Sequence, residues 1–129
     1  MRFTPTATVA WRSVVDADPS RMDRSELGAV LRALQVVRSL CDAVELDVTA
    51  RTRKLADTGR SEPVEALLVN ETGRSARDAR RAAARNTACD AAPGLQAALA
   101  DGTLTGGHLD AVATAIGRLE GDDVVAEFA

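Results

Sequence analysis

Aromatic residues are nearly absent from this 129-residue chain, which has one Trp, two Phe and no Tyr. Strands rely on aromatic and β-branched side chains to cover their pleated surface, whereas Ala and Leu are strong helix formers. Hydrophobic residues still make up 46% of the sequence, so the core must be built from Ala, Leu and Val. This composition predicts an all-α protein with closely packed helices, and the length is typical of one domain.

Long apolar runs and paired cysteines are missing as well. No segment approaches the roughly 20 apolar residues that span a bilayer, and the N-terminus lacks the pattern of a secretory signal. Cys41 and Cys89 are isolated, belong to no CxxC motif and fall within expected helices. We therefore expect a cytoplasmic protein with no membrane partner, in which both cysteines are reduced core residues.

Histidine is limited to His108, and the common catalytic arrangements are missing with it. The sequence shows no Ser-His-Asp grouping, no paired-carboxylate cleft and no zinc-ligand spacing. Gly106-Gly107 lacks the Lys-Ser/Thr that follows in a phosphate-binding loop. His108 lies three residues after Thr105, where it can hydrogen-bond back to a helix cap. These absences predict a non-catalytic chain with no cofactor and no metal.

The strongest helical pattern begins at Asp23, which together with Glu26 resembles a capping box. It is interrupted at Arg51, resumes at Leu55 and stops before Gly59. The sequence therefore predicts one long helix over residues 23–58. Its apolar residues alternate at spacings of three and four, as in the a and d positions of a coiled coil. These residues are Leu27, Val30, Leu34, Val37, Cys41, Val44 and Val48.

The apolar surface of this long helix has two interpretations. It packs against other helices of the same chain, or it pairs with a second copy in a homodimer through residues 23–58. Leu31, Leu40 and Leu46 widen the surface beyond two positions per heptad. That width favours packing within one helical domain over a free two-stranded coil.

Shorter segments flank the long helix. Residues 1–22 are interpreted as a flexible N-terminal arm or one short helix, and residues 23–129 as the helical domain. Ser61 is expected to cap a short helix that ends near Glu71. Further helices are expected over residues 94–100 and 105–119, with another beginning at residue 122. The abrupt end at Glu-Phe-Ala predicts truncation at the C-terminus.

Basic residues are concentrated in one segment. Residues 74–85 carry five arginines and one acid, whereas residues 86–129 carry one arginine and seven acids. Gly73 can end one helix in the left-handed conformation, and Ser75 can cap the next, with Asp78 three residues later. The arginines of this second helix are the candidate nucleic-acid-binding residues, and all but Arg80 follow spacings that place them near one side. They are Arg74, Arg77, Arg80, Arg81 and Arg85.

Two functions are compatible with this segment. A short helix, a tight turn and an Arg-rich second helix is the layout of a helix-turn-helix unit, whose second helix enters the major groove of DNA. No Asn or Gln on the same face would read bases, so contact with DNA would be weakly specific. In the alternative, the chain is a structural interaction module. Its arginines then pair with carboxylates of the acidic segment, namely Asp90, Asp101, Asp110, Glu120 or Asp122.

Two runs of the sequence are similar to a known family. They are Thr72-Gly-Arg-Ser-Ala-Arg-Asp-Ala-Arg-Arg and Leu95-Gln-Ala-Ala-Leu-Ala-Asp-Gly-Thr-Leu-Thr-Gly-Gly-His-Leu-Asp-Ala-Val. With the long helix before them, they resemble the actinobacterial 13E12 repeat, a helical module of unknown function found ahead of HNH endonuclease domains. The resemblance covers roughly residues 25–125.

The resemblance to the 13E12 repeat implies a DNA-associated helical module that accompanies a nuclease domain. An HNH site uses at least two histidines, one as general base and one as a metal ligand. This chain has only His108, so it lacks the histidines that an HNH site requires. The resemblance therefore implies that the nuclease domain is a missing C-terminal part of a longer protein.

Overall fold

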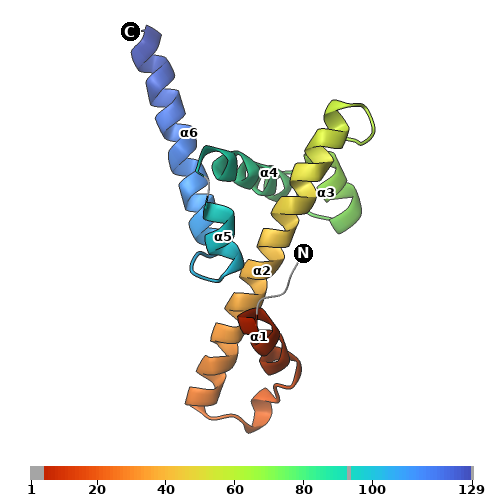
Figure 1. Cartoon of the computed structure of the whole chain (residues 1–129), viewed down its shortest axis with the longest axis vertical. Coiled ribbons are helices and arrows are strands. Elements are labelled where there is room, and N and C mark those ends of the chain that lie inside the picture. Colours follow the sequence, from red (N-terminus) through yellow and green to blue (C-terminus); the bar gives the residue numbers. More distant parts are fainter. Residues whose placement is uncertain (1–4, 93, 129) are drawn as a thin grey trace.

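A computed structural model describes residues 5–92 and 94–128 of the chain, and the side chains of these residues as far as residue 119. Every secondary-structure element among the described residues is a helix, and none is a strand, so the predicted all-α class is confirmed (Figure 1). A 3-10 turn at Pro19–Arg21 separates the first two helices. The α-helices are α1 (Pro5–Val15), α2 (Arg24–Asp57), α3 (Val64–Thr72), α4 (Ala76–Ala91), α5 (Leu95–Ala100) and α6 (Gly106–Phe128).

The long predicted helix is α2, which has 34 residues and extends about 50 Å at 1.5 Å per residue. Asp23 caps it, because its Oδ1 accepts a hydrogen bond from the Glu26 backbone N–H at 2.8 Å. It ends at Asp57, Thr58 is its C-cap, and the following Gly59 has a φ of 73°, in the left-handed region that glycine adopts without steric cost. Both termini lie within one residue of their predicted positions.

Residues 5–15 form a helix that packs on α2 and are not a loose arm. Helix α1 runs back along the first half of α2, and Ala7 and Ala10 are buried between the two helices (Figure 1). Small side chains at these two positions let the helix axes approach closely. Of the two interpretations of this segment, the short helix is the correct one.

Helices α3 to α6 gather around the second half of α2. One core contains Leu46 of α2, Leu99 of α5 and Leu109 of α6, and the last two are fully buried. A second core joins α3 to α4 through Val64, Leu68, Ala79 and Ala82. Alanines in both cores supply the close helix contacts that the aromatic-poor composition requires.

Two helix boundaries differ from the sequence prediction. Ser61 does not cap α3, whose N-cap is Pro63; the Ser61 hydroxyl instead donates to the Glu62 carbonyl oxygen. The last helix does not stop near Leu119, because α6 continues to Phe128 as one helix of 23 residues. Gly121 is the only weak helix former at the expected break, and a single glycine costs about 1 kcal/mol, which does not end a helix.

The buried side of α2 is not the predicted heptad stripe. Ala43 and Leu46 face the helices that follow, whereas Cys41 and Val48 of the stripe are exposed. The alternation of apolar residues was identified correctly, but the chain covers a neighbouring face of the helix. No helix among the described residues is long and apolar enough to cross a membrane.

Candidate nucleic-acid interface

The Arg-rich helix starts where the sequence predicts. Gly73 ends α3 in the left-handed conformation with a φ of 71°, and its N–H bonds to the Val69 carbonyl oxygen. Ser75 caps α4, since its hydroxyl oxygen accepts from the Asp78 N–H at 3.1 Å. Helices α3 and α4 are thus joined by a turn of three residues and run in crossing directions (Figure 1).

Three of the five predicted arginines lie on one exposed face of α4. They are Arg77, Arg80 and Arg81, in the N-terminal half of the helix. Arg81 is 3.9 Å from Asp78 in the preceding turn, and both side chains are about half exposed, so this pair is weak. Among the described side chains, Arg77 and Arg80 have no ion-pair partner. Their charges are available to an external anion.

A shallow cleft runs beside these three arginines. It has a volume of about 340 Å³ and lies between α4 and α6. The α6 side contributes Asp110, whose carboxylate is paired with Arg85, and the small side chains of Ala113 and Thr114. The cleft is open to solvent and does not enclose a small ligand.

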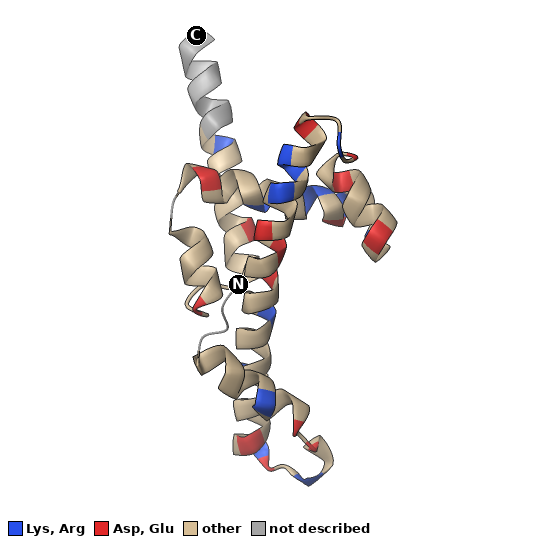
Figure 2. Cartoon of the chain, turned by 45° about the vertical axis from the view of Figure 1, so that its right-hand side comes forward, with Lys and Arg blue, Asp and Glu red and all other residues tan. Residues whose placement is uncertain are grey.

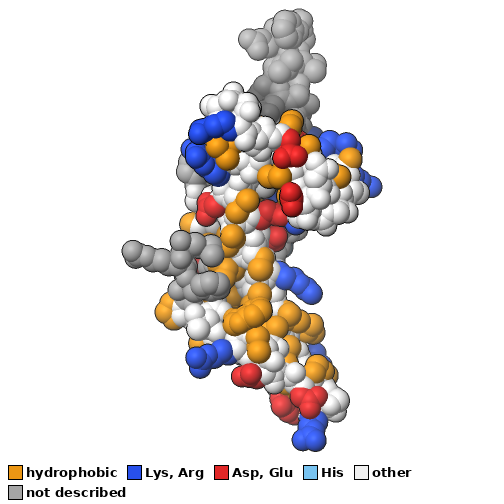
Figure 3. Space-filling view, turned by 90° about the vertical axis from the view of Figure 1, so that its right-hand side faces the viewer, with side chains coloured by type: hydrophobic (Ala, Val, Ile, Leu, Met, Phe, Trp, Pro, Cys, Tyr) orange, Lys and Arg blue, Asp and Glu red, His pale blue; other side chains and the backbone are white. Residues whose placement is uncertain are grey.

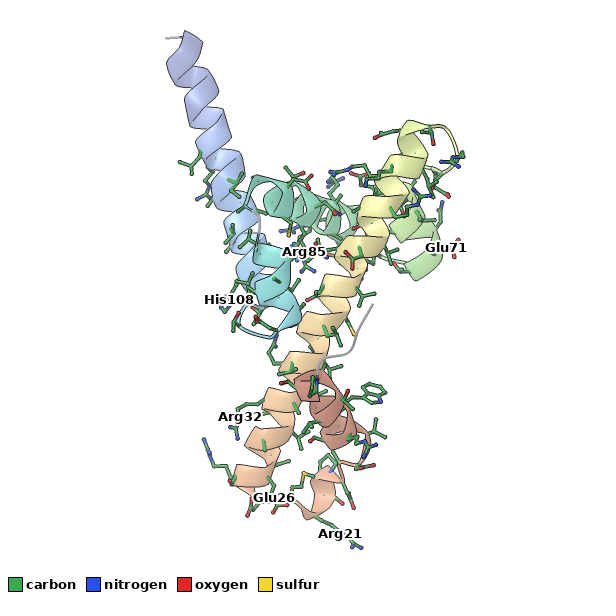
Figure 4. All side chains as sticks on the ribbon, viewed as in Figure 1. Arg21, Glu26, Arg32, Glu71, Arg85 and His108 are labelled. Atoms are coloured by element: carbon green, nitrogen blue, oxygen red, sulfur yellow. The ribbon has the colours of Figure 1, made fainter. Side chains whose placement is uncertain are left out.

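Arg85 is part of the fold and not of the exposed face. Its Nε and Nη2 atoms bond to the two carboxylate oxygens of Asp110, at 2.6 and 3.0 Å, and its Nη1 lies 3.2 Å from Asp42. The side chain is only 15% exposed and lies where α2, α4 and α6 meet (Figure 4). The hydrogen bonds to Asp110, opposed by burial, raise the pKa of Arg85 above its ordinary value, so this cation is permanent.

Gly106, the first residue of α6, is required beside this ion cluster. A Cβ atom at Gly106 would overlap the Asp42 carboxylate and crowd the Arg85 guanidinium at 3.0 Å. The close approach places the Asp42 carboxylate at the N-terminus of α6, where the helix dipole favours negative charge. One of the two glycines in the Thr-Gly-Gly-His run is therefore explained by packing.

Arg74 also faces inward. Its Nη2 lies 2.5 Å from Oε1 of Glu45 on α2, and the two side chains are 36% and 20% exposed. Acidic positions follow the middle of α2 near the crossing with α4 (Figure 2). Arg85 of α4 and Arg74 of the turn before α4 are thus two predicted site residues that pair with carboxylates of α2.

The partners of these two arginines were only partly foreseen. Asp110 was one of the expected carboxylates, whereas Asp42 and Glu45 were not considered. Asp42 and Glu45 are three residues apart in the apolar long helix, and such acids need a cation when another helix covers them. Their position was the feature of the sequence that could have predicted these pairs. Asp90 pairs with Arg53 at 2.8 Å, and Asp101 accepts hydrogen bonds from Thr103. The side chains of Glu120 and Asp122 lie outside the described residues.

His108 has a structural role at the start of α6. Its backbone N–H donates to the Thr105 hydroxyl oxygen at 3.1 Å, and its Nδ1 accepts from the Thr105 N–H at 3.4 Å. This is the reciprocal geometry of a capping box, with histidine in place of the usual Glu or Gln. Among the described side chains, no three His, Cys, Asp or Glu residues are grouped so as to hold a metal ion.

A buried polar contact fixes the position of α4 on α2. Asn86 Nδ2 donates to Thr49 Oγ1 at 2.5 Å, and both residues are buried. The Thr49 hydroxyl in turn donates to the Glu45 carbonyl oxygen at 2.8 Å. With Asp42 and Glu45 on the same helix, this contact sets which face of α4 turns outward, and that face carries Arg77, Arg80 and Arg81.

Comparison of the chain with protein-family models, with characterised proteins and with solved structures gave no match. The resemblance to the 13E12 repeat therefore remains a prediction from sequence.

Proposed function

We propose that this chain is a non-catalytic helical module that contacts the phosphate backbone of DNA through Arg77, Arg80 and Arg81. The observation that supports the proposal is the exposed, cationic N-terminal half of α4, in a chain whose net charge is −3. Because the protein as a whole is acidic, contact with a polyanion has to be local. In a helix-turn-helix unit it is the N-terminal part of the second helix that reaches the groove.

The proposed surface excludes Arg74 and Arg85. Arg85 has Asp42 and Asp110 as partners, and Arg74 has Glu45, so exchanging these carboxylates for phosphates would break contacts within the fold. Three phosphate contacts give weak affinity and a salt dependence with a slope of about −0.9 per contact. The exposed face offers no Asn or Gln that would read bases, so we expect weak sequence preference.

Fluorescence anisotropy with a labelled random-sequence duplex at low and physiological salt tests the proposal. We expect the triple variant R77A/R80A/R81A to lose at least tenfold in affinity and to flatten the salt slope by about 2 to 3. The matched control is R12A/R24A/R32A, which removes three exposed arginines of α1 and α2 and the same charge. Absence of binding at low salt, or equal losses in both variants, would overturn the proposal.

The second candidate is a structural module that docks a nuclease domain or a second copy without touching DNA. It is favoured by the inward ion pairs of Arg74 and Arg85, which show that part of the Arg-rich helix serves the fold. Wild-type protein that binds neither a duplex nor a single strand at low salt would support this candidate.

A further inference from the structure

An apolar groove lies between α1 and the middle of α2. Its volume is about 320 Å³, and it is lined among the described residues by Ala7, Trp11, Val37, Leu40, Cys41 and Val44. Trp11 is 54% exposed, and Val48, one turn beyond the groove on α2, is 56% exposed. Figure 3 shows hydrophobic side chains gathered along this face of the molecule.

The α2 side of the groove is half of the predicted heptad stripe. Val37, Cys41, Val44 and Val48 follow one another at spacings of four, three and four, so they lie along one line of the helix. Helices α4, α5 and α6 pack on the other side of α2, around Ala43 and Leu46. A pattern typical of helix pairing is thus left uncovered among the described residues.

We propose that a second copy of this chain covers the groove, with the two α2 helices antiparallel. A two-fold axis between Cys41 and Val44 places Val37 opposite Val48 of the second copy, and Cys41 opposite its Val44. By symmetry this gives four consecutive layers, all of them apolar. The stripe is therefore complementary to itself, which is the requirement for a two-fold interface.

The charges beside the stripe select the antiparallel orientation. Arg38 and Glu45 each follow a d position and therefore flank the same edge of the stripe. In the antiparallel pair, Arg38 of each copy lies beside Glu45 of the other. Arg38 is exposed, and Glu45, which is already paired with Arg74 within the same copy, retains 20% exposure. Arg38 of the second copy would therefore be a second cation beside this carboxylate. A parallel pair would instead place Arg38 beside Ala33 and Glu45 beside Leu40, where neither charge gains a partner.

Trp11 reports directly on this interface, because it is the only Trp in the chain and lines the groove. On dimer formation its fluorescence should shift to shorter wavelength as the chain is concentrated, in parallel with a doubling of mass by analytical ultracentrifugation. The stripe is short, so we expect a dissociation constant on the order of micromolar. This pairing does not depend on DNA contact by α4.

Val48→Glu is the variant that tests the surface. Val48 is exposed, so the variant should fold, and it should remain monomeric at concentrations where the wild type is a dimer. Leu119→Glu adds the same charge at a 63% exposed leucine of α6, away from the groove, and should dimerise as the wild type does. Helical circular dichroism checks that both variants are folded. A wild type that stays monomeric at hundreds of micromolar, or equal effects of the two variants, would overturn the proposal.

Disulfide trapping tests the orientation. Two chains without native cysteines, C41A/C89A, carry either Val37→Cys or Val48→Cys. A disulfide needs the two Cβ atoms about 3.5–4.5 Å apart, so it can form between positions that face each other across the pair but not between positions far apart along the helices. Mild oxidation should therefore cross-link the mixture of the two chains much more than either chain alone. Efficient cross-linking of the Val48→Cys chain to itself would contradict the antiparallel arrangement.

Discussion

The two halves of α2 differ in how they are held. The first half is accompanied by α1, and its Leu27 and Leu31 are 39% and 65% exposed. The second half is surrounded by α3 to α6, and arginines on α2 and α4 tie the helices together. We refer to residues 5–41 as the hairpin and to residues 42–119 as the cluster. The cluster is held by buried apolar side chains and by ion pairs. The hairpin is held by contacts of small apolar side chains such as Ala7 and Ala10, and some of its larger apolar side chains are exposed to solvent.

This difference indicates separate roles. Ion pairs with partly buried carboxylates require a definite geometry, so the cluster can hold the exposed arginines of α4 in one orientation. An exposed apolar stripe is costly in an isolated chain, and it becomes favourable when another surface covers it. The cluster therefore carries the proposed DNA contact. The proposed contact with a second copy spans the boundary between the two regions, with Val37 and Cys41 in the hairpin and Val44 and Val48 in the cluster.

The largest expected effect is the loss of a leucine from the core of the cluster. Leu109→Ala removes a fully buried side chain and leaves a cavity beside Leu46 and Leu99, so it should lower the free energy of unfolding by about 2 to 5 kcal/mol. Leu31→Ala in the hairpin, at 65% exposure, should change it by less than about 0.5 kcal/mol. Urea unfolding followed by circular dichroism measures both. Equal losses would mean that the two halves are stabilised alike.

An intermediate effect is expected from Arg85→Ala. The substitution leaves the carboxylates of Asp42 and Asp110 without their cation, and it should lower the free energy of unfolding by about 1 to 3 kcal/mol. Arg77→Ala on the exposed face of the same helix should lie within about 0.5 kcal/mol of the wild type. If Arg85→Ala left the free energy of unfolding unchanged, the ion cluster would not be what holds α4 in place.

The smallest effect concerns the two thiols, one in each region. Burial and the charge of Asp90 raise the pKa of Cys89, whereas Cys41 is exposed. Near pH 8, Cys89 therefore has a smaller fraction of the reactive thiolate than an ordinary cysteine. In dilute solution it should react with an aromatic disulfide reagent several-fold more slowly than the exposed Cys41. As the pH rises through the pKa of Cys89, its thiolate fraction increases and the difference should narrow.

Stopped-flow absorbance measures both thiol rates in the single variants C41A and C89A. In guanidinium chloride, where neither site is folded, the two rates should become similar. If α2 pairs with a second copy as proposed, concentrating the protein should slow the reaction of Cys41 and leave that of Cys89 unchanged. A Cys89 that reacts faster than Cys41 in the dilute native chain would contradict the comparison between the two regions.

Local features of the fold were predictable because they depend on neighbouring residues. Asp23, Ser75 and Thr105 were identified as caps, and each accepts a hydrogen bond from the backbone N–H three residues later. Gly73 was identified as a helix end, and it has the left-handed conformation. The prediction that Ser61 caps α3 was wrong, because Pro63 takes the N-cap position.

The candidate site was predictable in its residue types but not in its exposure. Helical spacing grouped Arg74, Arg77, Arg81 and Arg85, whereas the exposed face contains Arg80 in place of Arg74 and Arg85. The difference arises from Asp42, which is 43 residues before Arg85, and Glu45, which is 29 residues before Arg74. Each carboxylate becomes a neighbour of its arginine only when α4 crosses α2. Spacing within one helix carries no information about such a crossing.

The sequence by itself determined the helical class, the extent of the long helix and the start of the Arg-rich helix, because composition, periodicity and capping act over a few residues. Only the tertiary structure decided which face of each helix is covered. Ala43 and Leu46 became core while Val48 of the same helix stayed exposed, and Arg85 became an internal ion pair while Arg77 stayed at the surface. The physical reason is that burial and pairing depend on which distant helices pack together, a property of the whole chain.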